Sequence, residues 1–180
     1  MILRLFGVKG EKMKQFSVKD LVQIALVAAI YVALTLTPPL NAISYGMYQF
    51  RIAEMLNFLA FYNKKYIVAV TIGCMIANFY SFSMVDVIVG GGSTLVFVTL
   101  GVYLFKRYQN SKPILGIFNK AFFYFSFFFA TSMITVAVEL NFFGMPFLLT
   151  WFTTAVGELA SLLVGSLIIE KLAKRIDFKA

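Results

Sequence analysis

The stretch ISYGMYQFRIAEMLNF, residues 43–58, places a group of polar side chains inside an otherwise apolar chain of 180 residues. A charged group held at the centre of a bilayer costs about 3 kcal/mol, so such groups usually face a partner, a cavity or a ligand. We therefore interpret this stretch as one wall of a binding site, around which the rest of the chain supplies membrane spans. Its polar side chains are Gln49, Arg51, Glu54 and Asn57.

The composition is typical of an integral membrane protein. Hydrophobic residues make up 61% of the chain and the mean hydropathy is +0.85, whereas charged residues make up only 13%, about half the share usual in soluble domains. A helix needs about 20 residues to cross the hydrocarbon core. The chain therefore has room for six passes, and we predict an all-α, six-transmembrane-helix bundle that forms a single domain.

Apolar runs and helix-stopping residues give the expected boundaries of these helices. The second helix, with about 14 residues, covers only about 21 Å, so the loop before it, residues 38–48, must dip into the membrane region or fold over the site. A six-helix domain is expected over residues 18–172, preceded by a basic segment, 1–17, and followed by a tail, 173–180. The helices are expected at residues 18–37, 49–62, 66–82, 85–105, 119–141 and 146–172.

The basic residues predict the orientation of the chain. With six helices, nearly all of the 16 Lys and Arg residues fall on one side, which the positive-inside rule makes cytoplasmic. Both termini are then cytoplasmic and the protein lies in a plasma membrane. Arg51 is the exception, on the outer side beside Glu54, which makes it a candidate for function. The net charge of +8 follows from this topology, and we do not interpret it as nucleic-acid binding.

The chain contains no histidine and one cysteine, Cys74. A disulfide within the chain, a zinc or haem site built on His and Cys, and a catalytic triad with an imidazole base are therefore excluded. We expect neither a metal nor a cofactor, and no enzyme activity.

Several polar residues of the apolar runs fall in the outer half of the expected bundle, which suggests a site open to the exterior for a cationic or hydrogen-bond-donating ligand. Glu158 lies about 18 Å into the last helix, near the midplane. Tyr45 and Trp151 can stack on a flat ring, or can belong to an interfacial aromatic belt. The outer polar residues are Glu54, Asn78, Asp86 and Glu139, together with Gln49 and Arg51.

Some of these residues have structural alternatives. Arg51 and Glu54, three residues apart, can form an ion pair on one helix face, and Asp86 can cap the start of its helix. Glu158 has no capping role in mid-helix, so we expect a ligand contact or a buried hydrogen bond to another helix.

The first helix carries Ala25, Ala29 and Ala33 at a spacing of four residues. Small residues on one stripe let another helix approach closely within a membrane. The stripe can serve packing inside this bundle or contact with a separate protein.

Four segments resemble the sequence pattern of QueT transporters, over roughly residues 18–172. They are ISYGMYQFRIAEML (43–56), IGCMIANFYS (72–81), VDVIVGGGSTL (85–95) and WFTTAVGEL (151–159). QueT transporters are substrate-binding S-components of energy-coupling factor (ECF) transporters associated with uptake of queuosine precursors. The resemblance implies an S-component fold that works with a transmembrane coupling subunit and two ATPases, docked through Ala25, Ala29 and Ala33. The chain itself lacks a GxxxxGK[ST] motif for ATP hydrolysis.

The resemblance also implies a 7-deazaguanine ligand, such as 7-aminomethyl-7-deazaguanine. We expect Glu158 or Glu139 to bind its guanine-like edge, and Asp86 or Glu54 to bind its ammonium group. Gln49 and Asn78 are expected to bind the remaining polar atoms. The alternatives are an S-component for another vitamin or nucleobase, and a stand-alone ion-coupled carrier with a proton site at Glu54, Asp86 or Glu158; the chain shows no inverted repeat typical of such carriers.

Overall fold

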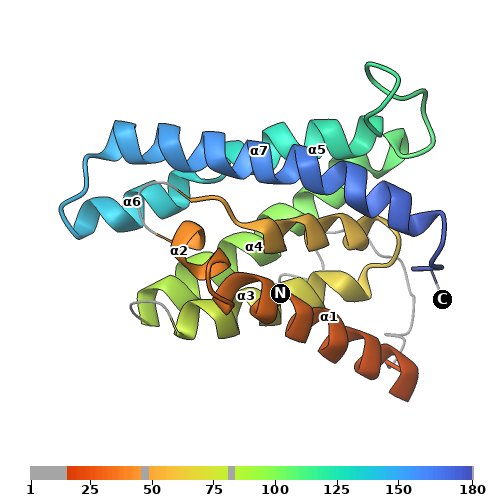
Figure 1. The fold of residues 1–180 in the computed structure, drawn as a ribbon, viewed down its shortest axis with the longest axis horizontal. Coiled ribbons are helices and arrows are strands. Elements are labelled where there is room, and N and C mark those ends of the chain that lie inside the picture. The colour runs from red at the N-terminus through yellow and green to blue at the C-terminus, as the bar shows by residue number, and fades with distance from the viewer. Residues whose placement is uncertain (1–15, 46–48, 81–83, 180) are drawn as a thin grey trace, which may run out of the picture.

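A computed structural model of the chain describes residues 16–45, 49–80 and 84–179, and the secondary-structure elements of these ranges are all helices. Helices α5 and α7 lie along one side of the elongated molecule and α1 along the opposite side, with α4 and the 3₁₀-helix η2 between them (Figure 1). The elements are α1 (Val18–Leu36), α2 (Leu40–Ser44), η2 (Ile52–Phe61), α3 (Lys65–Phe79), α4 (Met84–Phe105), η3 (Lys106–Tyr108), α5 (Lys120–Thr131), α6 (Ile134–Phe142) and α7 (Phe147–Ala173).

Within the described ranges, four helical segments are long and apolar enough to cross a membrane. They are Val18–Leu36, Met84–Tyr108, Lys120–Phe142 and Phe147–Ala173. The two remaining apolar helices, η2 and α3, are shorter.

Three expected elements differ from the structure. The loop over residues 38–48 contains a short helix, α2, before the chain reaches residues 46–48, which lie outside the described part. The helix expected over 49–62 is the 3₁₀-helix η2, which begins at Ile52. The helix expected over 119–141 is divided into α5 and α6, where the Ser132 hydroxyl donates to the Phe129 carbonyl oxygen at 2.6 Å. Of the expected N-terminal segment 1–17, residues 1–15 lie outside the description.

The core is centred on η2, whose residues from Leu56 to Phe61 are all buried. Phe58 and Phe61 contact Phe122 and Phe125 of α5, with ring centroids 4.5 to 5.5 Å apart. Aromatic pairs at these distances stabilise a core beyond their buried area. This packing holds the short η2 between α1 and α3 on one side and α5 and α7 on the other.

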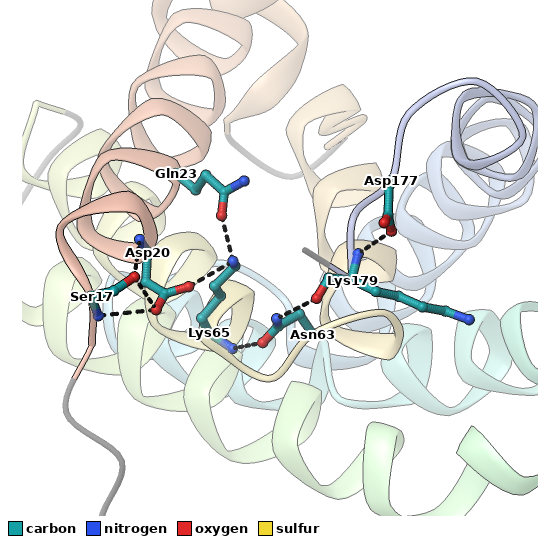
Figure 2. Close-up of polar contacts among 7 residues, drawn as sticks. All are labelled: Ser17, Asp20, Gln23, Asn63, Lys65, Asp177 and Lys179. Atoms are coloured by element: carbon teal, nitrogen blue, oxygen red, sulfur yellow. Dashed lines mark hydrogen bonds and ion pairs between the residues drawn. The ribbon is translucent and has the colours of Figure 1, made fainter.

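A polar clasp joins α1 to α3 at the end of the molecule that also holds the C-terminus (Figure 2). Lys65 is buried, and its ammonium group binds the Asp20 carboxylate at 2.8 Å and the side-chain oxygen of Gln23. Asp20 also accepts a hydrogen bond from the backbone N–H of Ser17, the residue that caps α1. The clasp therefore fixes the first turn of α1 against the start of α3.

We expect the Lys65→Met substitution to lower the melting temperature by several degrees, because it leaves Asp20 and Gln23 without their buried donor. Thermal unfolding of the purified protein measures this. Lys64→Met, at the exposed neighbouring residue, is the matched control and should melt like the wild type. Equal melting temperatures for the two variants would show that the clasp contributes nothing to stability.

Candidate ligand-binding site

A cavity of about 360 Å³ lies at the end of the molecule where α2 and α6 are found (Figure 1). It is formed by residues from six parts of the chain: the end of α2, the segment 49–51, α3, α4, α6 and the turn before α7. Of the nine residues expected to bind substrate, six line it together. The lining residues are Tyr45, Gln49, Arg51, Asn78, Asp86, Gly90, Val136, Glu139, Leu140, Phe143 and Met145.

The non-helical segment that carries Gln49 and Arg51 is packed tightly against α7. A Cβ atom added at Gly157 would lie 1.8 Å from the carbonyl oxygen of Gln49, far inside van der Waals contact. One helical turn further on, the Ser161 hydroxyl donates to the carbonyl oxygen of Arg51 at 2.5 Å. Gly165 continues the same stripe against the side chain of Met55. These small residues of α7 set the position of the two polar side chains at the cavity.

Arg51 links this segment to the end of α2. Its Nε donates to the carbonyl oxygen of Ser44 at 2.9 Å, and its guanidinium carbon lies 5.3 Å from the centre of the Tyr45 ring. Tyr45 in turn donates from its hydroxyl to the carbonyl oxygen of Ala77 at 2.9 Å. Burial raises the pKa of Tyr45, so the phenol stays protonated and keeps this hydrogen bond. The positive charge and the aromatic ring are therefore held beside each other at the cavity wall.

Asn78 reaches from α3 to α4. Its Nδ2 donates to the backbone carbonyl oxygen of Asp86 at 3.1 Å. A Cβ atom at Gly90 would lie 2.0 Å from that nitrogen, so the glycine makes room for the amide. This close approach places the Asn78 amide and the first turn of α4, with Asp86, on one side of the cavity.

Glu139 of α6 carries a hydrogen-bond acceptor that is not paired with a donor from the described residues. The residue is 5% exposed, and its Oε1 has no hydrogen-bond partner among the described residues. A buried acceptor of this kind normally has a partner, whether protein, water or ligand. Because Glu139 and Asp86 both line the cavity, the site can bind an N–H donor or an ammonium group.

The other three expected residues do not line the cavity. Glu54 is buried and accepts hydrogen bonds from the Tyr31 hydroxyl at 2.5 Å and from Asn57 Nδ2 at 2.6 Å. These bonds, rather than the considered ion pair with Arg51, occupy its carboxylate. Glu158 is 1% exposed, and its Oε1 has no hydrogen-bond partner in the described part of the chain. Trp151 packs against the core, with Nε1 3.4 Å from the Thr131 carbonyl oxygen.

Sequence reasoning missed the apolar part of the lining. Val136 lies three residues before Glu139 in α6, and Phe143, just past the end of α6, lies four residues after it. Helical periodicity applied to Glu139 could have found these two, whereas Leu140, the next residue after Glu139, does not follow that spacing. Met145 carries no comparable signal.

The three expected alanines of α1 lie together on the surface. Ala25, Ala29 and Ala33 are exposed and line a shallow groove with Ile72 and Ile76 of α3. Close packing inside the molecule is made instead by Ala28, whose carbonyl oxygen would lie 3.2 Å from a Cβ atom at Gly73. The stripe is therefore open to contact with a separate helix.

Comparison with known proteins identifies the family. A family model described as QueT transporter matches residues 21–174. The queuosine precursor transporter QueT of Lactococcus lactis subsp. cremoris (strain MG1363) is 61% identical over 166 residues, which cover 92% of this chain and 98% of that protein. No solved structure matches the chain. With its long apolar helices, this multi-pass membrane protein belongs to the QueT transporter family.

Proposed function

We propose that this protein binds a queuosine precursor in the cavity and is the substrate-binding S-component of an ECF-type importer. The observation that carries the proposal is the unpartnered Oε1 of Glu139, which lies with Asp86 in a cavity of ligand size. Small-molecule sites are typically about 300 to 1,000 Å³ and mostly apolar, with a few placed polar groups. The Lactococcus relative, named as a queuosine precursor transporter, supports the class of ligand.

The lining suits 7-aminomethyl-7-deazaguanine. Its guanine-like edge offers N–H donors, its aminomethyl group is cationic near neutral pH, and a carboxylate binds such donors more strongly than a neutral acceptor does. Of the four carboxylates expected from the sequence, Glu139 and Asp86 line the cavity, which favours them for these roles. Arg51 can donate to the ligand carbonyl oxygen, and Tyr45 and Phe143 can contact the ring faces.

In the proposed arrangement the chain crosses a prokaryotic plasma membrane six times, with η2 and α3 as its two short passes. The membrane domain is residues 18–172, and the segments 1–17 and 173–180 are cytoplasmic. The clustering of Lys and Arg at one end supports this orientation. The cavity then opens toward the exterior, where a scarce nutrient is captured.

The exposed alanine stripe of α1 is proposed to dock on the coupling subunit, which works with two ATPases. We expect Ala29→Trp to abolish copurification with the coupling subunit and to lower uptake at least about tenfold, because the indole fills the groove. Ligand affinity, measured by calorimetry, should not change.

Ala160→Trp, at an exposed alanine of α7, is the matched control and should copurify normally. If Ala29→Trp copurified and transported like this control, the alanine groove would not be the docking surface.

Uptake of radiolabelled precursor into proteoliposomes distinguishes an S-component from a stand-alone carrier. We expect uptake only when the coupling subunit and both ATPases are reconstituted and ATP is present inside. Uptake by this chain alone, abolished when the proton gradient is dissipated, would instead establish the ion-coupled carrier.

A further inference from the structure

A groove lined mainly by aromatic side chains lies on the exposed surface of the helix bundle, between the end of α4 and α5. It has a volume of about 510 Å³, and its lining is almost entirely apolar. Tyr124 and Phe127 are exposed within it, at 37% and 46%. The residues of this aromatic groove are Phe105, Phe123, Tyr124, Phe127, Phe128 and Thr131.

Two cations lie at one end of the aromatic groove. The guanidinium carbon of Arg107 lies 4.7 Å from the centre of the Tyr108 ring, and Lys120 Nζ lies 5.4 Å from the same centre. Lys120 Nζ is also 5.9 Å from the ring centre of Tyr124, which lines the groove. Contacts with aromatic faces hold cations in place, so two positive charges are gathered where the apolar lining begins.

The charges of these two cations are not balanced by any carboxylate in the described part of the chain. Among the described residues, no carboxylate forms an ion pair with Arg107 or Lys120. The connection between η3 and α5 adds one more basic residue, Lys112, and contains no Asp or Glu. Two like charges on one ring repel each other, and a bound anion would remove that repulsion.

We propose that this surface is a binding site for an anionic phospholipid. Arg107 and Lys120 bind the headgroup phosphate, and one acyl chain lies in the aromatic groove. From Lys120 to Thr131 the helix rises about 16 Å, close to half of the roughly 30 Å hydrocarbon core. The groove thus has the length of a single leaflet, with its charged end at the level of the headgroups.

A phospholipid, which carries an acyl chain as well as a phosphate, accounts for both the cations and the aromatic groove, whereas a free phosphate accounts only for the cations. The cations alone would suit any anion, but the groove that continues from them offers almost entirely apolar contacts. Basic residues near a membrane surface attract anionic lipids by an energy that adds for each charge. The proposal is independent of the ligand cavity and of the coupling subunit.

Native mass spectrometry of the intact, detergent-solubilised protein tests the site. We expect phosphatidylglycerol to bind at least about tenfold more tightly than phosphatidylcholine, and the Arg107→Gln/Lys120→Gln variant to lose that preference. The control variant Lys171→Gln/Lys174→Gln loses the same amount of positive charge, at the end of α7, and should retain the preference for phosphatidylglycerol. Thr131→Trp, which fills the groove and keeps both cations, should weaken phosphatidylglycerol binding as well.

Any one of four results would overturn the proposal. If both charge variants lost the preference for phosphatidylglycerol to the same extent, the lipid would be responding to the net charge of the protein alone. Unchanged binding in Thr131→Trp, or full competition by inorganic phosphate, would show an anion site without an acyl groove. Equal affinity of the wild type for the two phospholipids would show that the headgroup is not recognised. Melting temperatures of all variants, measured without added lipid, identify any variant that fails to fold.

Discussion

Replacing Glu139 with glutamine is expected to weaken binding of 7-aminomethyl-7-deazaguanine by more than about tenfold. The Glu139 carboxylate lines the cavity, and its Oε1 has no protein donor among the described residues, so a ligand N–H or ammonium group would be its partner. A hydrogen bond to a charged group contributes about 1.5 to 3 kcal/mol, and about 1.4 kcal/mol corresponds to a tenfold change in Kd. Isothermal titration calorimetry measures the change.

Glu170→Gln is the matched control, because Glu170 also belongs to a helix, the last turn of α7. That helix ends near the C-terminus, at the opposite end of the molecule from α2 and α6 (Figure 1). Its affinity should equal that of the wild type. Glu158→Gln is expected to have a smaller effect than Glu139→Gln, since Glu158 does not line the cavity. Unchanged affinity in Glu139→Gln would remove this residue from the site.

Replacing Gly157 with valine is expected to reduce ligand affinity at least about tenfold, although Gly157 does not line the cavity. Any Cβ at this position would lie 1.8 Å from the Gln49 carbonyl oxygen, so the backbone that carries Gln49 and Arg51 must move. Overpacking of this kind typically costs about 1 to 3 kcal/mol of stability. We expect Gly157→Ala to show the same effects in milder form.

Gly92→Ala provides the control for this substitution. A Cβ atom at Gly92 meets nothing within 4 Å, and alanine is favoured over glycine inside a helix. The control should therefore bind ligand like the wild type and melt at the same or a higher temperature. If Gly157→Val kept wild-type affinity, the contact between α7 and residues 49–51 would not position the site.

Much of the cavity could be predicted because intramembrane polar residues are few. A charged or amide side chain in an apolar run needs a partner. This argument selected Gln49, Arg51, Asn78, Asp86 and Glu139, which line the cavity, and also Glu54 and Glu158, which do not. The same argument could not separate ligand contacts from internal hydrogen bonds. Glu54 satisfies the rule through Tyr31, a residue whose hydroxyl carries no distinctive signal in the sequence.

The path of the backbone was harder to predict than the positions of the helices. Apolar length marked the long helices to within a few residues, because each needs about 20 residues to cross a bilayer. The 3₁₀ form of η2 has no signal in the sequence, whose apolar run there is equally compatible with an α-helix. The close approach of α7 depends on Gly157 and Ser161, which contact the backbone of residues 49–51. The spacing of these two small residues in the sequence does not indicate which segment they contact.

The most direct test of this account is a calorimetric titration of the purified wild-type protein with 7-aminomethyl-7-deazaguanine, its nitrile analogue and guanine. Calorimetry is preferred to tryptophan fluorescence because Trp151 does not line the cavity. The account predicts saturable binding at one site, tightest for the aminomethyl compound, because the paired carboxylates favour a cation. Absence of binding heat with every 7-deazaguanine, at several temperatures and with a folded protein, would contradict it.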